Sequence, residues 1–394
     1  MRSVTDQQPF ANYQYEIYLA GVTGQRPELP FSSEEWERRA REILGAGAYG
    51  YVAGGAGAED TMRANLAAFR RWRIVPRMLR DVGVRDLRVS LFGSELAAPL
   101  LLAPVGVQAI VHEDGELATA RAAAALGLPM VLSTAASRTM EDVAEALGEA
   151  PGWYQLYWPN DRELAASFLH RAEAAGYGAI VVTLDTFMLA WRPRDLSGAY
   201  LPFLKGVGIA NYLADPTFRA ALERPPEEDP QAAVGRWALS YSDPTLTWDD
   251  LRFLRENTSL PVLLKGILHP DDARKAVEHG VDGIVVSNHG GRQVDGSIAA
   301  LDALPRVMSA VPDDFPVLLD SGVRTGADVV KALALGARAV LIGRPYVWGL
   351  AVGGEAGVRH VMRSLLAELD LTIALCGVRS VRDLSPDILL REAS

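Results

Sequence analysis

The 394-residue chain has one cysteine, Cys376, which excludes an internal disulfide and a multi-cysteine metal site. Its six histidines show no HExxH or similar metal spacing. Basic residues are outnumbered, because 39 Lys and Arg against 49 Asp and Glu give a formal net charge of −10. That charge argues against a nucleic-acid partner, which requires a basic face. What remains is an ordinary globular composition, with 49% hydrophobic and 22% charged residues.

Long apolar segments are also lacking. No run reaches the ~18 apolar residues of a membrane span. The start of the chain, MRSVTDQQPFANYQYE, is polar and aromatic and does not resemble a signal peptide. We therefore expect a cytoplasmic protein without a membrane partner. The length suits two domains or one large α/β barrel with extensions.

Short apolar runs recur from residue 100 onward, and they are continuous rather than alternating, as in strands buried on both faces. There are eight of them: 100–103, 130–133, 153–157, 179–184, 261–265, 283–287, 316–320 and 339–343. Stretches with helical start and stop signals separate most of them. Eight βα units predict an α/β fold of the (β/α)8 TIM-barrel type. The alternative, a doubly wound open sheet, usually has fewer strands and a GxGxxG after the first, where this chain has PVGVQ.

Two terminal segments lie outside this pattern. We expect residues 1–99 to form an N-terminal helical extension, with helices at 32–44 and 59–70. A hairpin around DLRVSLFGSEL in the same segment is predicted to plug the bottom of the barrel. Residues 100–394 form the barrel itself, and the part from residue 346 extends the eighth helix and finishes in polar turns.

A third segment, residues 195–247, interrupts the rhythm between the fourth and fifth strands and contains the Pro-rich, acidic stretch ERPPEEDPQ. Connections longer than ~15 residues are usually lids, binding loops or disordered. Because this one follows the carboxyl end of a strand, we expect a long lid loop over the barrel mouth.

Polar side chains follow almost every predicted strand, at the end of a barrel that holds active sites. They are Ser133, Gln155, Tyr157, Thr183, Asp185, Lys265, Ser287, His289 and Asp320. A buried charge is costly unless it is paired, so Lys265, Asp185 and Asp320 must have partners. Structural ion pairs explain one or two such residues but explain a convergent set poorly.

The last two turns, DSGVRTG (320–326) and IGRP (342–345), are rich in glycine and carry Arg324 and Arg344. Backbone N–H groups and cations at this corner of a barrel are typical of phosphate sites. The sequence therefore predicts a ligand that bears a phosphate, either a substrate or a cofactor.

The stretch SNHGGRQ (287–293) resembles the signature of the FMN-dependent 2-hydroxy acid oxidases and dehydrogenases. LAPVGVQ, TLDT, WRPRD, LLKGI and DSGVRTG match the same family, so the resemblance covers nearly the whole chain. Within the family, YEIYLAG, WRPRDL and the long acidic lid look most like lactate 2-monooxygenase. The resemblance implies FMN as cofactor, a small 2-hydroxy acid and O2 as reactants, and a homotetramer or homo-octamer.

The resemblance also implies roles for individual residues. Four residues are implied to be catalytic. His289 takes the hydroxyl proton while the α-hydrogen leaves as hydride to flavin N5, and Asp185 stabilises the resulting imidazolium. Tyr157 assists at the substrate hydroxyl, and Lys265 assists at the flavin. Substrate binding is assigned to Tyr51, Arg192, Arg292, Tyr157 and Ala135. FMN binding is assigned to Pro104, Val105, Gly106, Ser133, Gln155, Thr183, Lys265, Ser287, Asp320, Gly322, Arg324, Gly343 and Arg344. We expect the glycines at 290 and 291 to clear space for flavin and substrate.

The implied reaction is oxidation of L-lactate followed by decarboxylation of retained pyruvate to acetate, CO2 and water. A plain oxidase, which releases the keto acid and H2O2, uses the same catalytic residues and stays open. Two further alternatives are an FMN-dependent isomerase and a barrel that binds flavin without catalysis. Ala135 is small where glycolate oxidases carry tryptophan, which favours lactate.

Overall fold

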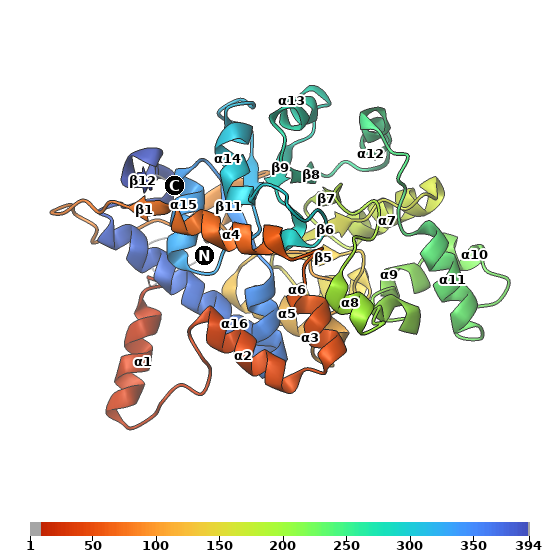
Figure 1. Cartoon of the computed structure of the whole chain (residues 1–394), viewed down its shortest axis with the longest axis horizontal. Coiled ribbons are helices and arrows are strands. Elements are labelled where there is room, and N and C mark those ends of the chain that lie inside the picture. Colours follow the sequence, from red (N-terminus) through yellow and green to blue (C-terminus); the bar gives the residue numbers. More distant parts are fainter. Residues whose placement is uncertain (1–8, 393–394) are drawn as a thin grey trace.

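The eight predicted strands close into a parallel barrel in the computed structural model, which describes residues 9–392 (Figure 1). Each strand pairs with its neighbours in chain order, and the last pairs with the first through Val340 and Leu100. The strands are β4 (Leu100–Leu102), β5 (Met130–Ser133), β6 (Gly152–Leu156), β7 (Ile180–Thr183), β8 (Val262–Ile267), β9 (Gly283–Val286), β10 (Val317–Leu319) and β11 (Ala339–Ile342). The TIM-barrel prediction is confirmed.

Helices surround this barrel and connect its strands (Figure 1). They are α5 (Glu116–Leu126), α6 (Met140–Leu147), α7 (Arg162–Ala174), α12 (Leu251–Asn257), α13 (Pro270–Glu278), α14 (Ala300–Met308), α15 (Gly326–Ala334) and α16 (Arg344–Leu375). Several start at side-chain caps; for example, Thr139 accepts from the N–H of Asp142 at the start of α6. The long α16 is broken at Gly353 and Gly354, whose backbone angles are not helical.

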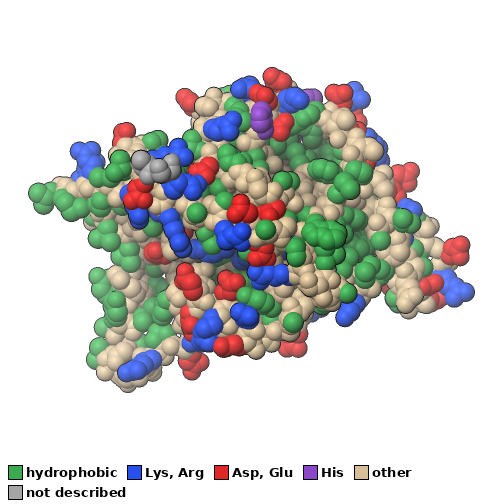
Figure 2. Space-filling model, viewed as in Figure 1, with side chains coloured by type: hydrophobic (Ala, Val, Ile, Leu, Met, Phe, Trp, Pro, Cys, Tyr) green, Lys and Arg blue, Asp and Glu red, His purple; other side chains and the backbone are tan. Residues whose placement is uncertain are grey.

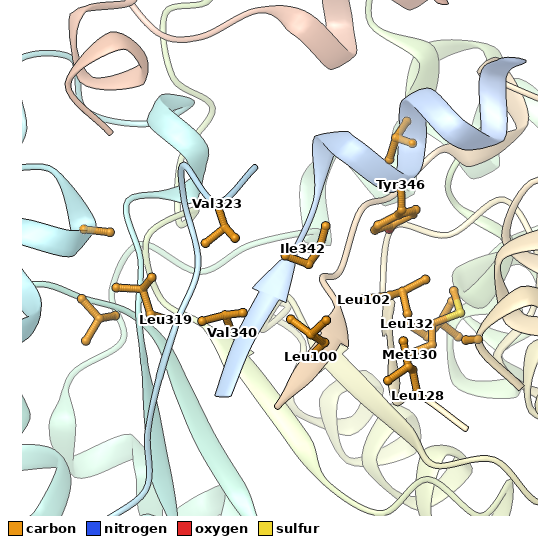
Figure 3. Packing of buried hydrophobic residues seen from close by; sticks show 14 of the residues in the cluster. Leu100, Leu102, Leu128, Met130, Leu132, Leu319, Val323, Val340, Ile342 and Tyr346 are labelled. Atoms are coloured by element: carbon orange, nitrogen blue, oxygen red, sulfur yellow. The ribbon is translucent and has the colours of Figure 1, made fainter. Parts of the chain in front are cut away.

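Successive strand residues face opposite sides of the barrel wall, as the period of two requires. Leu100, Leu102 and Ile342 are among the residues that pack outward under the helices (Figure 3). The alternate residues form a separate interior cluster: Leu101, Val131, Val181, Leu263, Val285, Leu318 and Leu341. Both faces are therefore apolar, which explains the continuous apolar runs in the sequence.

A hairpin of β2 (Val89–Leu91) and β3 (Ser94–Leu96) closes the amino end of the barrel. Its turn places Phe92 and Gly93 at φ 49° and 78°, as a two-residue hairpin with the native twist requires. Leu91 and Leu96 join the interior cluster, and the Phe92 ring lies 5.5 Å from that of Trp153. The hairpin lies where it was expected.

The N-terminal extension contains both predicted helices, α2 (Ser33–Ile43) and α4 (Asp60–Arg70). It also contains two that the sequence did not predict, α1 (Asn12–Val22) and α3 (Ala46–Ala53). Two glycines inside α3 lower its intrinsic helix propensity, so its pattern resembled a loop. Residues 1–8 of the expected extension lie outside the described residues.

The C-terminal prediction of an extended helix followed by polar turns was incomplete. After α16 the chain forms β12 (Leu389–Arg391), which pairs antiparallel with β1 (Trp72–Ile74). Each of these strands has three residues and includes an arginine, so neither gave an apolar run to detect.

The segment 195–247 is ordered into short helices rather than forming an open loop. They are α8 (Pro193–Ser197), η3 (Pro202–Lys205), α9 (Ala210–Leu213), α10 (Pro216–Ala220) and α11 (Pro230–Ser240). Tyr212 packs edge-on against Phe168 of α7, with ring centroids 4.9 Å apart. The buried Asp215 accepts from Ser167 at 2.7 Å and from Arg171 at 3.0 Å. These contacts attach the lid segment to α7. In the described part of the chain, no helix has the length and apolarity to cross a membrane.

Candidate active site

A cavity lies at the carboxyl ends of the barrel strands, and most of the predicted site residues line it. They are Tyr51, Pro104, Val105, Gly106, Ala135, Tyr157, Arg192, Lys265, His289, Arg292, Asp320, Gly322, Arg324, Gly343 and Arg344. Thr183, Asp185 and Ser287 line a second cavity that adjoins the first. Ser133 and Gln155 are not in either lining; both are buried, and Oε1 of Gln155 accepts from the Ser133 hydroxyl and from the N–H of Thr134. The barrel therefore gathers the strand-end residues of the sequence around one place.

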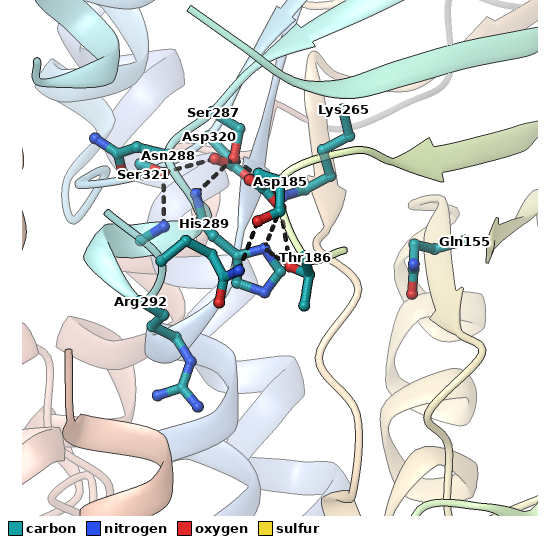
Figure 4. Close-up of polar contacts among 12 residues, drawn as sticks. Gln155, Asp185, Thr186, Lys265, Ser287, Asn288, His289, Arg292, Asp320 and Ser321 are labelled. Carbon is teal, nitrogen blue, oxygen red and sulfur yellow. Dashed lines mark hydrogen bonds and ion pairs between the residues drawn. The ribbon is translucent and has the colours of Figure 1, made fainter. Parts of the chain in front are cut away.

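His289 and Asp185 form a hydrogen-bonded pair across the mouth of the barrel (Figure 4). Nδ1 of His289 lies 2.8 Å from Oδ1 of Asp185, and the Thr186 hydroxyl donates to the same oxygen at 3.0 Å. Because an ionised carboxylate only accepts, the imidazole donates through Nδ1 and keeps the lone pair on Nε2. This geometry leaves Nε2 of His289 able to accept a proton.

The electrostatic surroundings of His289 lower the pKa of its imidazole. Burial lowers the pKa of His289, Lys265 and Arg192 lower it further, and Asp185 opposes them. Burial alone would raise the pKa of Asp185, but His289 and Lys265 bring it below its ordinary value. A neutral imidazole therefore faces an ionised carboxylate at neutral pH.

The turn that carries His289 is conformationally unusual. His289, Gly290 and Gly291 all have positive φ, at 58°, 66° and 76°. The N–H of His289 donates to Ser287 Oγ at 3.0 Å, and the N–H of Gly290 donates to Ser321 Oγ at 2.9 Å. These bonds hold a non-glycine residue in the left-handed region, where strain is typical of functional positions.

The expected role of the two glycines needs a correction. A Cβ on Gly291 would lie 2.6 Å from the backbone nitrogen of Met62, and one on Gly290 would lie 2.9 Å from Arg344 Nη1. Only Gly290 lines the cavity. Gly291 is therefore required by close packing against α4 and by its positive φ rather than by ligand access.

Lys265 has the partner that its burial demands. Its ammonium lies 3.0 Å from Asp320 Oδ2 and donates to Ser287 Oγ at 3.0 Å (Figure 4). Burial alone would lower the pKa of Lys265, but Asp320 and Asp185 outweigh it and raise the pKa. Lys265 is thus a fixed cation at the bottom of the site. Asp320, expected at the ribityl chain, pairs with this lysine.

Four arginines share the cavity, and their guanidinium groups bond mainly to backbone carbonyls. Arg292 donates to Tyr51 and Gly54, and its Cζ lies 4.9 Å from the Tyr51 ring centroid. Arg344 donates at 2.9 Å to three carbonyls, those of Val52, Gly54 and Gly290. Arg324 donates to the carbonyl of its neighbour Val323. Arg192 donates to the carbonyl of Arg292 and to the side chain of Gln293. Within residues 9–392, none of the four forms an ion pair with a carboxylate.

This clustering is unfavourable without an anion. Burial lowers the pKa of Arg292 to about 10 and that of Arg344 to about 9, and the mutual proximity of Arg292, Arg324 and Arg344 contributes to the second shift. Buried cations that lack counter-charges carry a large desolvation cost. The cavity is therefore suited to bind negative charge at two places. One is formed by Arg324 and Arg344 near β10 and β11, and the other by Arg192 and Arg292 near His289.

The residues present fit FMN. Arg324, Arg344 and the start of α16 suit its phosphate, because helix N-termini and guanidinium groups both favour anions. Nε2 of Gln155 is buried and has no hydrogen-bond partner among the described residues, so it is available to a polar ring edge. Lys265 supplies a cation in the cavity, and the turn at residues 104–106 lines the same cavity.

Several residues of the site were not singled out from the sequence. Ser321 donates to Asp320 at 2.7 Å and accepts from the N–H of Gly290 at 2.9 Å. Gln293 donates to the carbonyl of Asp185 at 2.5 Å. Gln293 lies in SNHGGRQ and Thr186 lies in TLDT, so membership in these motifs could have identified both as site residues. Arg194 lies outside the cavity and pairs with Glu59 at 2.7 Å.

The lid segment contributes aromatic side chains that could not be assigned from the sequence. Phe203, Trp237 and Tyr241 line the cavity and stack in series, with ring centroids 4.8 and 5.3 Å apart. Phe203 also meets the Tyr51 ring edge-on at 6.4 Å. These three rings form an aromatic roof that adjoins Tyr51 and, through it, Arg292.

A barrel with a cation-rich corner and a buried histidine–aspartate pair is consistent with an enzyme that binds a phosphate-bearing cofactor, and comparison with known proteins identifies the family. Residues 40–391 match the model of the FMN-dependent dehydrogenase family. The chain is 47% identical to the FMN-dependent alpha-hydroxy acid dehydrogenase qulF of Penicillium citrinum, over 97% of this chain and 96% of that one. It is 46% identical to an L-lactate oxidase of Lysinibacillus sphaericus, over 95% and 96%.

Among solved structures, mandelate oxidase superposes with a TM-score of 0.80 at 39% identity, covering 89% of this chain and 96% of that one. The chain therefore belongs to the FMN-dependent dehydrogenase family. It is a flavin-dependent oxidoreductase and its cofactor is FMN. The family resemblance drawn from SNHGGRQ and the other motifs is confirmed.

Proposed function

We propose that this enzyme oxidises a small L-2-hydroxy acid, L-lactate, and then decarboxylates the keto acid before it leaves. The observation that carries the first step is the His289–Asp185 pair, with its free Nε2, in the same cavity as Arg192 and Arg292. A base beside two unpaired cations suits an anionic substrate with an acidic proton to lose. The relatives named as lactate oxidase and hydroxy acid dehydrogenase support the same substrate class.

In the proposed mechanism the substrate carboxylate binds to Arg292 and Arg192, since a planar guanidinium matches a carboxylate. Nε2 of His289 accepts the proton of the substrate hydroxyl, and Asp185 stabilises the resulting imidazolium. Burial raises the pKa of Tyr157, so its phenol stays protonated and can donate to the hydroxyl or keto oxygen. The chemistry that FMN would supply when bound is acceptance of the α-hydrogen with its electron pair and transfer of two electrons to O2. Lys265 stabilises negative charge near that group.

The fate of the keto acid distinguishes two versions of this function. With decarboxylation, L-lactate and O2 give acetate, CO2 and water, in which every atom is accounted for. The aromatic roof of Phe203, Trp237 and Tyr241 favours this version, because a covered site slows product release. The small Ala135 leaves room for a methyl substituent. The alternative is an oxidase that releases pyruvate and H2O2.

Product analysis of the purified yellow protein with L-lactate tests the proposal. Under air, acetate and CO2 equal to the lactate consumed would support decarboxylation, while stoichiometric pyruvate and H2O2, measured with catalase controls, would identify the oxidase. Without oxygen, lactate should bleach the flavin and give pyruvate. No bleaching by any 2-hydroxy acid would refute both versions.

Assembly and location are part of the same proposal. We infer a homotetramer or homo-octamer, as the family resemblance implies, and a cytoplasmic location. Light scattering of the purified holoenzyme tests the first, and fractionation of the source cells tests the second.

A further inference from the structure

A second cavity of about 630 Å³ lies beside the first, on the side of β7, β8 and β9. The two cavities share Tyr157, Thr186 and Leu189 in their walls, and the bonded pair also lies between them, because His289 lines the first cavity and Asp185 lines the second. The second cavity continues to the surface, where Phe187 and Met188 are exposed. On the face drawn in Figure 2, hydrophobic side chains gather over the region where Figure 1 shows β7, β8 and β9.

The chemistry of this cavity is opposite to that of the first. Its described lining contains no Lys, Arg or His, and its ionisable side chains other than Tyr157 are three aspartates, Asp185, Asp243 and Asp272. Most of the wall is apolar, including Trp158, Leu251 and Leu268. By contrast, the first cavity contains Lys265 and four arginines. An anionic hydroxy acid or keto acid is attracted to the first cavity and repelled from the second.

The proposed function requires a second entrance through which O2 can reach the site. If the keto acid stays under the aromatic roof until O2 arrives, O2 cannot enter by the space that the keto acid fills. A neutral, apolar molecule of two atoms pays no electrostatic cost beside aspartates and is favoured by apolar walls, just as dry apolar cavities take up xenon.

We propose that the second cavity is the route by which O2 reaches the site, and by which CO2 leaves, while the keto acid remains bound. This inference rests on the proposed function, because only a retained product makes a separate route necessary. Thr186 and Leu189 form the boundary that the gas crosses, immediately beside the His289–Asp185 pair.

The test narrows the cavity from two walls without altering the catalytic residues. Leu268→Trp fills it from the end of β8, and Ala190→Trp fills it from the loop after β7. Leu239→Trp is the matched control, because Leu239 is 76% exposed on α11 and lines neither cavity. The holoenzyme is photoreduced without substrate, mixed with O2 in a stopped-flow instrument, and followed by flavin absorbance with and without saturating pyruvate.

With pyruvate bound, both filling variants should react with O2 about tenfold more slowly than wild type, which corresponds to a barrier higher by about 1.4 kcal/mol. Without pyruvate the loss should be smaller, because the first cavity is then open. Anaerobic reduction by lactate should be unchanged, and Leu239→Trp should behave as wild type. In crystals pressurised with xenon, the gas should occupy the second cavity of the wild type.

The proposal fails if both variants react with O2 at the wild-type rate in the presence of pyruvate. It also fails if reduction by lactate falls in parallel, since the cavity would then be the substrate's route. Because photoreduction needs no substrate, the route is tested separately from the activity. If the variants slow the reaction with O2 but no 2-hydroxy acid reduces the flavin, the gas route stands and the proposed substrate class is wrong.

Discussion

The two ends of the barrel are built from the same eight strands but have opposite chemistry. At the amino end, interior residues such as Leu101 and Val285 pack with Leu96 of the hairpin into an apolar plug. At the carboxyl end the same strands continue into Lys265, Asp185 and His289. The plug gains free energy by burial, whereas the other end buries charges at a cost. Stability and activity should therefore be separable by substitutions at opposite ends.

The largest effect is expected at His289. In the proposed mechanism His289 accepts the hydroxyl proton, which a glutamine cannot do, so His289→Gln should slow anaerobic flavin reduction by lactate toward the upper part of the roughly 10²–10⁴-fold range typical of a general base. Because a glutamine amide can still donate to Asp185, the melting temperature should change little. Flavin content, measured by absorbance, controls for loss of FMN. Reduction at the wild-type rate would exclude His289 as the base.

Asp185→Asn should have the next largest effect on activity. An asparagine amide can donate to Nδ1, which would move the imidazole proton to Nε2 and block the lone pair that faces the site. Loss of the carboxylate also leaves the imidazolium unstabilised. Flavin reduction should fall by roughly 10²-fold or more. A rate within a factor of two of wild type would mean that the Nδ1 contact of 2.8 Å does not set the tautomer.

At the opposite end, Leu96→Ala should reverse the pattern. Leu96 is 1% exposed in the interior cluster, and truncating such a side chain typically costs about 2–5 kcal/mol of unfolding free energy. Flavin reduction should stay at the wild-type rate at temperatures where the variant is folded. Leu390→Ala, at a side chain that is 59% exposed, is the matched control and should change stability by less than about 0.5 kcal/mol. Equal losses in the two variants would show that the hairpin does not anchor the barrel.

The contrast between the two ends also explains what the sequence could predict. Buried parallel strands are continuous apolar runs, so β4 to β11 were detectable, and a polar residue at the end of such a run marks the mouth of a barrel. Lys265 and Asp185 were therefore expected to be paired. Which carboxylate would pair with which cation was not predictable, because it depends on the relative placement of strands far apart in the chain.

Features that depend on local irregularity or on distant contacts were missed for the same reason. The helix α3 contains glycines and gave no helical signal. The position of Trp237 over the cavity depends on how α11 packs, which a Pro-rich acidic sequence does not encode locally. Gly291 was assigned to ligand access, whereas its neighbour is Met62, more than two hundred residues earlier in the chain.

The smallest predicted effect concerns the pH dependence of the charged end. In the proposed mechanism neutral His289 is the active form, so the rate of flavin reduction should rise with pH through the pKa of His289 and then level off. Burial, Lys265 and Arg192 lower that pKa, so the acid limb should lie below the ordinary histidine value of about 6.5. Arg192→Gln removes one of these cations, which makes protonation easier and should move the limb to higher pH, by less than about one unit. The control is Arg194→Gln, because Arg194 pairs with Glu59 outside the cavity; this variant should leave the acid limb unchanged. Stopped-flow flavin reduction at saturating lactate, from pH 5 to 9, measures the acid limb of both variants. A limb that moves equally in the two variants would mean that the field of Arg192 does not reach the base.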